Sequence, residues 1–151
     1  MGIKEKINAD LKQAMLAGDK TLVMTLRGLK SVILYAEVAK DLREAGLQDS
    51  ELIDLLSKEA KKRQESADLY VRGGNSDKAE AEMAEKKIIE VYLPVQVSDE
   101  ELTQVVNETV SGLGVEGPAA MGQAIGVIKQ KLGGRADGGR IATAVKRRLS
   151  Q

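Results

Sequence analysis

The side chains of this sequence that could do chemistry gather near its C-terminus. Residues 118–151 hold seven Lys and Arg against Asp137 alone, a local charge of +6, whereas the 23 basic and 23 acidic residues of the whole chain cancel. Clustered cations bind the phosphates of nucleic acids, and a chain without net charge can do so only through a local patch. The candidate RNA-contacting residues are Lys129, Lys131, Arg135, Arg140, Lys146, Arg147 and Arg148.

A second explanation of the same charges is purely structural. Cations in the last turn of a helix complement its macrodipole and stabilise it by about 0.3–1 kcal/mol. That explanation accounts for Lys146, Arg147 and Arg148, which lie at the end of a helix expected over about 138–149. It does not account for Arg135 and Arg140, which flank the start of that helix, so both explanations stay open.

A secondary basic ridge lies in the charge-dense stretch 58–66. Glu59 precedes Arg63 by one helical turn, an order that stabilises a helix by about 0.2–0.5 kcal/mol. Because Glu59 and Glu65 dilute the positive field, a solvated helix face is the favoured interpretation, and a phosphate-contacting ridge is the alternative. The ridge consists of Lys58, Lys61, Lys62 and Arg63.

Glycine is concentrated in the same region as the cations. The run Gly-Gly-Arg-Ala-Asp-Gly-Gly-Arg at 133–140 lacks the Lys-Ser/Thr pair of a P-loop and predicts a tight connection with Asp137 as a helix N-cap. Backbone amides that bind an anion are the alternative. Gly122 and Gly126 lie one turn apart inside a helix, where each costs about 1 kcal/mol against alanine. Close approach of a neighbouring helix is the favoured reason, and close approach of a ligand backbone is the other.

The composition argues against independent catalysis. Cysteine and histidine are absent, which removes thiol nucleophiles, disulfides, histidine bases and the commonest zinc ligands. Carboxylate pairs such as Glu80 and Glu82 lie in polar segments, so nothing indicates the shifted pKa values that acid–base catalysis needs. With no Phe or Trp, an aromatic platform for base stacking is poorly supported. No catalytic residue, metal or cofactor is predicted.

Helices must position these residues, because apolar residues recur every three or four positions and no segment alternates as a strand would. Helices are expected over about 3–17, 20–46, 50–72, 76–93, 99–113, 118–132 and 138–149. The predicted fold class is all-α. An N-terminal domain of two helical hairpins, residues 1–95, is followed by a small C-terminal three-helix bundle, residues 98–151. Ser98 and Glu101 predict a capping box at the start of the second domain.

The spacing also predicts which side chains of the N-terminal domain face inward. The expected inward residues are Ile3, Ile7, Leu11 and Met15 in the first helix, Leu22, Leu26, Leu29, Ile33 and Ala36 in the second, and Leu52, Leu55, Leu56, Ala60, Ala67 and Val71 in the third.

The chain lacks the signals of a membrane or secreted protein. No apolar run approaches the roughly 20 residues that a membrane helix needs. Residues 1–6 begin an amphipathic pattern rather than a signal-peptide core. We therefore expect a cytoplasmic protein that does not contact a membrane.

Several short motifs, in order along the chain, resemble those of the YqeY-like family. They are Arg27-Gly28-Leu29-Lys30-Ser31-Val32, the block from Lys58 to Ser66, Tyr92-Leu93-Pro94, Met121-Gly122 and Gly134-Arg135-Ala136-Asp137-Gly138. The resemblance covers essentially the whole chain. Members of that family tend to carry an acidic residue before the Met-Gly pair, where this chain has Ala120, so Pro118 must set the start of that helix.

The resemblance implies a function as well as a fold. The family is similar to the all-helical tail of the B subunit of tRNA-dependent amidotransferase, which helps to hold tRNA while the chemistry occurs elsewhere. It therefore implies a free-standing accessory module that binds tRNA or another structured RNA, with aminoacyl-tRNA or amidotransferase machinery as further partners. Two alternatives stay open: a carbon–nitrogen ligase with glutamine as amido-N-donor that is active only with other subunits, and a helical protein–protein adaptor.

Overall fold

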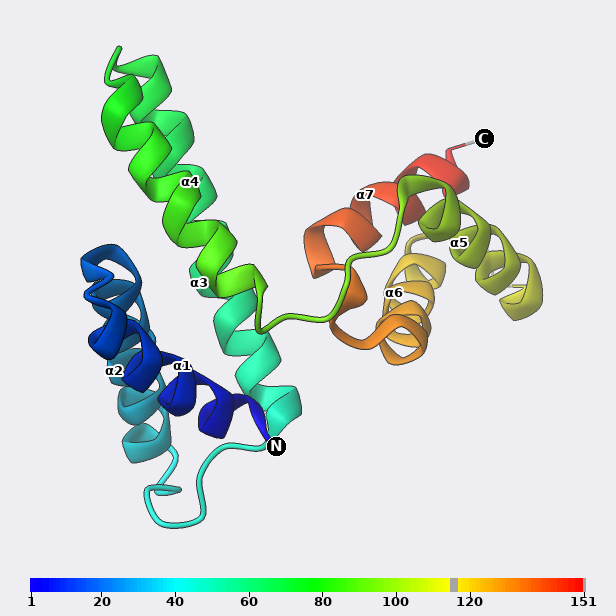
Figure 1. The fold of residues 1–151 in the computed structure, drawn as a ribbon. Coiled ribbons are helices and arrows are strands. Elements are labelled where there is room, and N and C mark those ends of the chain that lie inside the picture. The colour runs from blue at the N-terminus through cyan, green and yellow to red at the C-terminus, as the bar shows by residue number, and fades with distance from the viewer. Residues whose placement is uncertain (115–116, 151) are drawn as a thin grey trace. The chain divides into compact units, whose positions relative to one another are not determined.

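The structure is a computed structural model that describes residues 1–114 and 117–150, and every regular element in these residues is helical (Figure 1). The predicted all-α fold class is confirmed. The elements are α1 (Ile3–Ala17), α2 (Lys20–Ala39), α3 (Asp49–Arg72), α4 (Ser76–Glu90), α5 (Asp99–Leu113), α6 (Pro118–Leu132), a short 3₁₀ helix η1 (Gly133–Arg135) and α7 (Gly138–Leu149).

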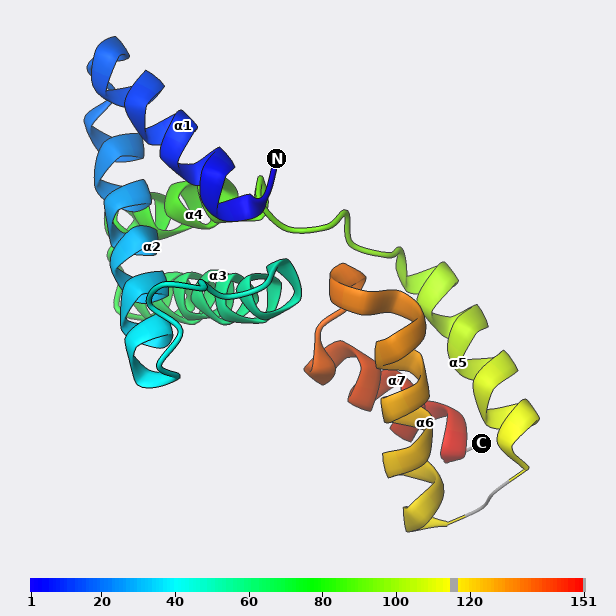
Figure 2. The same ribbon diagram turned by 90° about the horizontal axis from the view of Figure 1, so that it is seen from below.

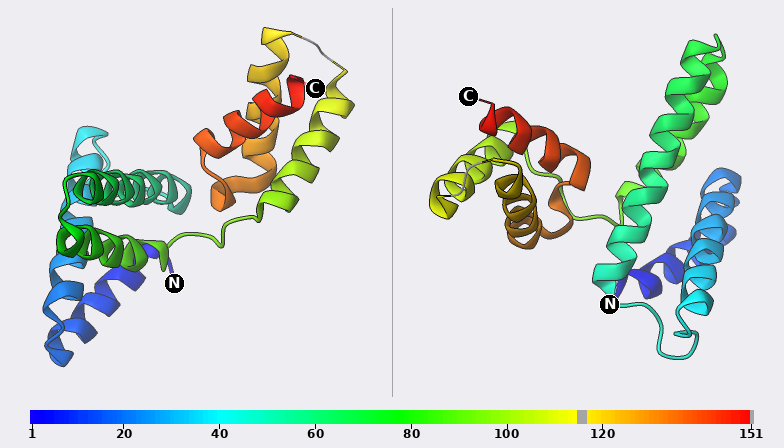
Figure 3. Two further views of the ribbon diagram at one scale, coloured as in Figure 1. Left: turned by 90° about the horizontal axis from the view of Figure 1, so that it is seen from above. Right: turned by 180° about the vertical axis from the view of Figure 1, so that it is seen from behind.

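The chain forms two compact units, Met1–Leu93 and Pro94–Gln151. In the first unit α1 pairs with α2 and α3 pairs with α4, while α2 also contacts both α3 and α4 (Figures 1 and 2). In the second unit α5, α6 and α7 each contact the other two, as two further views show (Figure 3). Each unit has its own core of buried side chains.

The first helix buries a stripe that drifts away from the predicted one. Ile7 and Leu11 are buried as expected, but Met15 is 54% exposed and Ala14 is buried in its place. Each step of four residues advances about 400° around a helix, so the third step from Ile3 has rotated about 120° away from the core. A step of three from Leu11 returns to the buried face at Ala14.

The second helix ends earlier than predicted, at Ala39 rather than near Gly46. Asp41 adopts a left-handed conformation with φ 56°, which turns the chain away from the helix axis. The amides of Asp41 and Leu42 then donate to the carbonyls of Val38 and Glu37, which satisfies the end of the helix. Short polar side chains such as aspartate tolerate this conformation better than most residues, so an aspartate here ends the helix as a glycine would.

A buried carboxylate, which the apolar spacing did not predict, ties α1 to α2. Glu37 faces inward next to the half-buried Ala36, and its side chain is only 1% exposed. Both of its oxygens accept hydrogen bonds from Lys4 Nζ, at 2.7 and 3.0 Å. A buried charge requires such a partner, because an unpaired carboxylate in the core would be strongly unfavourable.

Helices α3 and α4 extend beyond α1 and α2, and the turn that joins α3 to α4 lies at this far end (Figure 1). Ala67 and Ala79 are buried there, and their small side chains allow the two helices to lie close together. Val71, which was predicted to face inward, is 64% exposed instead. The amide of Asn75 donates to the carbonyl of Tyr70, and Gly74 has φ 75°, which completes the turn.

A tyrosine holds the end of the first unit against its first helix. Tyr92 lies two residues beyond α4, its ring is buried in the core, and its hydroxyl donates to Asp10 Oδ2 at 2.6 Å. Lys6 Nζ lies 5.6 Å from the centre of the same ring. The first residue of the Tyr-Leu-Pro motif therefore has a structural role, which is to hold α1 against the chain beyond α4.

The bounds of the last two helices agree with the prediction, at 118–132 and 138–149. Pro118 occupies the first turn of α6, and the Asp137 side chain accepts from the amide of Arg140 at 2.9 Å to cap α7. The capping box of α5 forms only in part. Ser98 Oγ accepts from the amide of Glu101 at 3.1 Å, but the Glu101 carboxylate bonds to Arg135 instead of returning to Ser98.

Replacing Tyr92 by phenylalanine keeps the ring in the core and removes the bond to Asp10. Because a hydrogen bond to a charged acceptor stabilises a protein more than a neutral one, we expect Tyr92→Phe to lower the free energy of unfolding by about 1–2 kcal/mol in urea denaturation. Tyr35→Phe is the matched control, since Tyr35 is 76% exposed, and it should change stability by less than about 0.5 kcal/mol. Equal losses would contradict a specific role for the Asp10 contact.

The same bond makes stability depend on pH in alkaline solution. Burial, and then the Asp10 carboxylate, raise the pKa of Tyr92 above its ordinary value of 10.0. Because the folded state holds the phenolic proton more tightly than the unfolded state, this stabilisation is complete below about pH 10 and is lost as the pH rises further. We expect urea denaturation at a series of pH values to show a steeper loss above about pH 10 in the wild type than in Tyr92→Phe. If the free energy of unfolding fell equally with pH in the two proteins, the loss would not come from Tyr92.

Candidate nucleic-acid interface

The basic residues predicted near the C-terminus are carried by α6, η1 and α7. Lys129 and Lys131 belong to the last turn of α6, Arg135 ends η1, and Arg140 lies in the first turn of α7. Lys146, Arg147 and Arg148 form the last turn of α7. Because α6 and α7 pack against each other, the second unit brings its cations onto two neighbouring helices.

Two of these cations hold the chain that leads into α5. Arg135 Nη2 donates to Glu101 Oε2 at 3.2 Å, and Arg135 Nε donates to the carbonyl of Val95 at 3.3 Å. Arg140 Nη2 donates to Asp99 Oδ1 at 2.9 Å and to the carbonyl of Val97 at 3.0 Å. A guanidinium suits this role because it can bind a carboxylate and a backbone carbonyl at once.

Backbone bonds join the same two segments. The amide of Val97 donates to the carbonyl of Arg135 at 2.8 Å, and Gln96 Nε2 donates to the carbonyl of Gly134 at 3.0 Å. Val97 and Ala136 are both buried in the core of the unit. The glycine-rich turn at 133–140 therefore forms a tight connection between helices, as predicted, and also anchors residues 95–99. Arg135 and Arg140, which the macrodipole did not explain, have structural partners.

The other five cations differ in how open they are to solvent. Lys129, Lys146 and Arg147 are exposed, and none of them forms an ion pair with a carboxylate in residues 1–114 or 117–150. Lys131 is exposed and its Nζ lies 3.2 Å from Thr109 Oγ1, a neutral acceptor. Arg148 is half-buried. We refer to Lys129, Lys146 and Arg147 as the exposed basic set.

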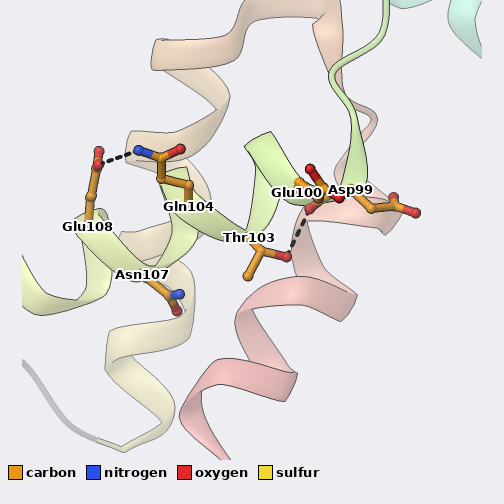
Figure 4. Close-up of a pocket in the computed structure, with 6 residues that line it drawn as sticks. All are labelled: Asp99, Glu100, Thr103, Gln104, Asn107 and Glu108. Atoms are coloured by element: carbon orange, nitrogen blue, oxygen red, sulfur yellow. Dashed lines mark hydrogen bonds between the residues drawn. The ribbon is translucent and has the colours of Figure 1, made fainter.

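The acidic counterpart of these cations lies on α5. This helix carries Asp99, Glu100, Glu101 and Glu108 and no basic residue. Figure 4 shows the outward face of α5, where Gln104 Nε2 donates to Glu108 Oε1 at 3.2 Å and Thr103 Oγ1 donates to the carbonyl of Asp99 at 2.8 Å. The shallow surface there is lined by α5 alone and offers no enclosed site.

The local net charge of +6 was calculated for residues 118–151 and therefore did not include the acids of α5. Over residues 94–151 there are seven basic and six acidic residues, which leaves an excess of one. The unit is therefore nearly neutral, with acids concentrated on α5 and cations on α6 and α7. The row of acidic residues at 99–101 was visible in the sequence, but nothing local indicated that two of them bind Arg135 and Arg140.

The helix glycines of α6 do not serve internal packing. Gly122 and Gly126 are exposed, and a Cβ atom added at either position would meet no atom within 4 Å. The favoured explanation, close approach of a neighbouring helix of this chain, is therefore wrong. The other explanation, close approach of a ligand backbone, stays a prediction.

The secondary ridge on α3 is partly occupied by contacts within the first unit. Glu59 is buried rather than solvated, and accepts from Lys62 Nζ at 3.1 Å and from Arg63 Nη1 at 3.3 Å. Arg63 Nε also donates to Glu85 Oε2 at 3.0 Å, which joins α3 to α4. Lys58 and Lys61 are exposed. The predicted ion pair between Glu59 and Arg63 is confirmed, and the expectation of a solvated face holds for Lys58, Lys61 and Lys62 but not for Glu59.

Over residues 1–114 and 117–150, no group of three or more acidic side chains is arranged so that it could hold a metal ion. In the same residues, no helix combines the length and the apolar character needed to span a bilayer.

Comparisons with known proteins identify relatives over most of the chain. Residues 4–149 match the family model described as Yqey-like protein. Several curated relatives are named "Altered inheritance of mitochondria protein 41, mitochondrial". That of Eremothecium gossypii is 36% identical over 97 residues, 62% of this chain and 52% of that protein. That of Lachancea thermotolerans is 34% identical over 116 residues, 75% of this chain and 60% of that protein. This chain thus spans about half the length of the first of these relatives.

The names of these relatives correct the expected localisation. Each is named as a mitochondrial protein, as is the relative from Pyrenophora tritici-repentis, which is 28% identical over 135 residues, 87% of this chain and 71% of that protein. The expectation of a purely cytoplasmic protein is therefore contradicted. It relied on the pattern of residues 1–6 and on the absence of a long apolar run, and neither feature decides the compartment in which such a helical protein works.

Removing the side chain of Arg140 should loosen the chain that leads into α5. We expect Arg140→Ala to speed hydrogen exchange at the Val97 amide and to lower the free energy of unfolding by about 1–2 kcal/mol, because a carbonyl and a carboxylate both lose a charged donor. Arg147→Ala is the matched control. It should leave hydrogen exchange at the Val97 amide unchanged and should alter the free energy of unfolding by no more than about 0.5 kcal/mol. Unchanged exchange at Val97 in Arg140→Ala would show that the anchor does not depend on this residue.

Proposed function

This chain belongs to the YqeY-like family, and from that premise we propose that it is an accessory module that binds structured RNA, with tRNA as the first candidate. The cations of α6 and α7 would contact the phosphate backbone. Phosphate contacts position a protein on RNA without reading its sequence, which suits a module that assists another enzyme. Residues 94–151 would act as a separate RNA-contacting domain.

The observation that carries the proposal is the exposed basic set. Lys129, Lys146 and Arg147 are open to solvent on two helices that pack together, and no carboxylate of the described residues pairs with them. A cation that is not already neutralised can release the counterions of RNA when it binds, which is the main source of affinity for a polyanion. Arg135 and Arg140 would contribute less, since each is already bonded within the unit.

Two further features support this assignment. The exposed glycines Gly122 and Gly126 lie on the same helix as Lys129 and present no side chain at these two positions, so a sugar–phosphate backbone could approach closely there. The acids on the outward face of α5 would repel RNA, which would leave α6 and α7 as the contacting side.

An accessory role also agrees with the chemistry that the chain offers. It contains no histidine or cysteine, so a cysteine nucleophile or a histidine base for amide transfer would have to come from another protein. The similarity of the family to the amidotransferase tail supports the same view. A carbon–nitrogen ligase that works only with other subunits has no separate support among the described side chains.

Charge reversal of the exposed basic set tests the proposal directly. We expect bulk tRNA to bind the wild type in a fluorescence titration at low salt, with an affinity that falls steeply as salt is raised. The triple variant Lys129→Glu, Lys146→Glu, Arg147→Glu should bind at least about tenfold more weakly and should lower the slope of log affinity against log salt by about two to three.

The matched control is the triple variant Lys12→Glu, Arg43→Glu, Lys87→Glu. It changes the net charge equally at exposed positions of the first unit and should lose affinity much less. Circular dichroism of both variants would establish that the helices remain folded. Absence of tRNA binding by the wild type at low salt, or equal losses in the two triple variants, would overturn the assignment of α6 and α7.

A further inference from the structure

The second helix, α2, carries two apolar seams on opposite faces. One seam faces the core of the first unit and consists of Leu22, Leu26, Leu29 and Ile33. The other repeats at steps of four, three, four and three residues and consists of Met24, Gly28, Ser31, Tyr35 and Val38. Steps of this kind keep side chains on one line along a helix and are typical of the seam where two helices pack.

The second seam is open to solvent throughout. Met24 is 73% exposed, Tyr35 is 76% exposed and Val38 is 55% exposed, and Leu34 beside them is 49% exposed. Single exposed apolar residues are common on proteins, but several of them on one helix face, separated only by the small residues Gly28 and Ser31, indicate an interaction surface. We refer to this line, residues 24, 28, 31, 35 and 38, as the outer seam.

The middle of the outer seam carries only small residues. No atom lies within 4 Å of the position that a Cβ on Gly28 would occupy, so the packing of this structure gives no reason for a glycine there. A glycine inside a helix costs about 1 kcal/mol against alanine. Ser31, one turn further on, is also small. Small residues flanked by Met24 and Tyr35 form a notch in which another helix can lie close to the backbone of α2.

The charges beside the outer seam have one sign. Lys20, Arg27 and Lys30 are exposed, whereas Glu37, the single acidic residue of α2, is buried against Lys4. Next to the seam, a hollow of about 220 Å³ lies between α1 and α2. Its lining consists of the apolar side chains of Ile7, Ile33 and Leu34 together with Ser31, Lys4, Lys30 and Glu37. A side chain that entered this hollow would meet apolar walls and Lys30, since Lys4 and Glu37 are already paired with each other.

We propose that the outer seam of α2 binds one amphipathic helix of a partner protein, with Leu, Ile or Met along its apolar stripe and Asp or Glu on its flanks. The partner helix crosses α2 at Gly28 and Ser31, and its acids pair with Arg27 and Lys30. The proposal does not depend on RNA binding, since it uses a different unit of the chain.

A second copy of this chain fits the seam poorly. The helices with the largest acidic excess are α4 and α5. The outward face of α5 presents Thr103, Gln104 and Asn107, and the exposed residues of α4 include no apolar side chain larger than alanine. Neither offers an apolar stripe, so charge and apolar pattern together point to a different protein.

A designed pair of peptides tests this proposal with the full chain. Both peptides are helices of about 18 residues with the same Leu/Ile stripe, one with Glu and the other with Lys on its flanks. We expect the acidic peptide to bind in fluorescence anisotropy at least about tenfold more tightly than its basic twin. We also expect it to shift the NMR signals of residues 24–38 rather than those of α6 and α7.

Filling the notch should abolish the contact without harming the fold. Glutamine is a good helix former without charge, so Gly28→Gln should raise the helix stability and yet weaken binding of the acidic peptide by about tenfold or more. Gly122→Gln is the matched control, because Gly122 is also an exposed helix glycine with no neighbour within 4 Å. Arg27→Glu with Lys30→Glu should likewise weaken binding, and Lys58→Glu with Lys61→Glu should not.

Several outcomes would overturn the proposal. One is equal affinity for the two peptides, and another is a set of shifts that leaves residues 24–38 unmoved. Loss of binding in Gly122→Gln as well as in Gly28→Gln would show that the notch is not the site. Shifts of residues 24–38 on raising the concentration of the protein alone, or on adding tRNA, would assign the seam to a second copy or to RNA instead.

Discussion

Polar side chains that join one helix to another determine how this aliphatic molecule fits together. With no Phe and no Trp, the cores consist mainly of Leu, Ile, Val and Ala, whose packing tolerates several arrangements of neighbouring helices. Glu37 bonded to Lys4, Tyr92 bonded to Asp10, and Arg140 bonded to the chain at Val97 each require one relative position. Their geometry selects one arrangement from those that apolar packing alone would allow.

The same contacts decide which charges are left for a partner. Arg63, Arg135 and Arg140 are each bonded within their own unit, although in the sequence they are indistinguishable from Arg147. A count of cations along the chain therefore overstates the positive surface. What distinguishes the available residues is the absence of a nearby carboxylate among the described residues, a property of the folded chain rather than of a stretch of sequence.

Features set by neighbouring residues were predictable, and features set by distant ones were not. Pro118 and Asp137 mark the starts of α6 and α7 where the structure has them, because each acts on the turn beside it. The early end of α2 escaped prediction because Asp41 adopts a conformation more usual for glycine. The partners of Arg140 lie about 40 residues earlier, and no spacing rule links such positions. The surroundings of Gly122 and Gly126 were not predictable, because a glycine in the sequence does not reveal whether a neighbouring helix packs against it.

The separation of acids on α5 from cations on α6 and α7 gives the C-terminal unit an electric dipole moment despite its near neutrality. A dipole in the non-uniform field of a highly charged polymer experiences a torque before any contact is made, and it turns its oppositely charged end toward the polymer. Because the net charge is small, the attraction at long range is weak while the turning effect at short range persists. A nearby polyanion would therefore turn this unit more than it would attract it from a distance.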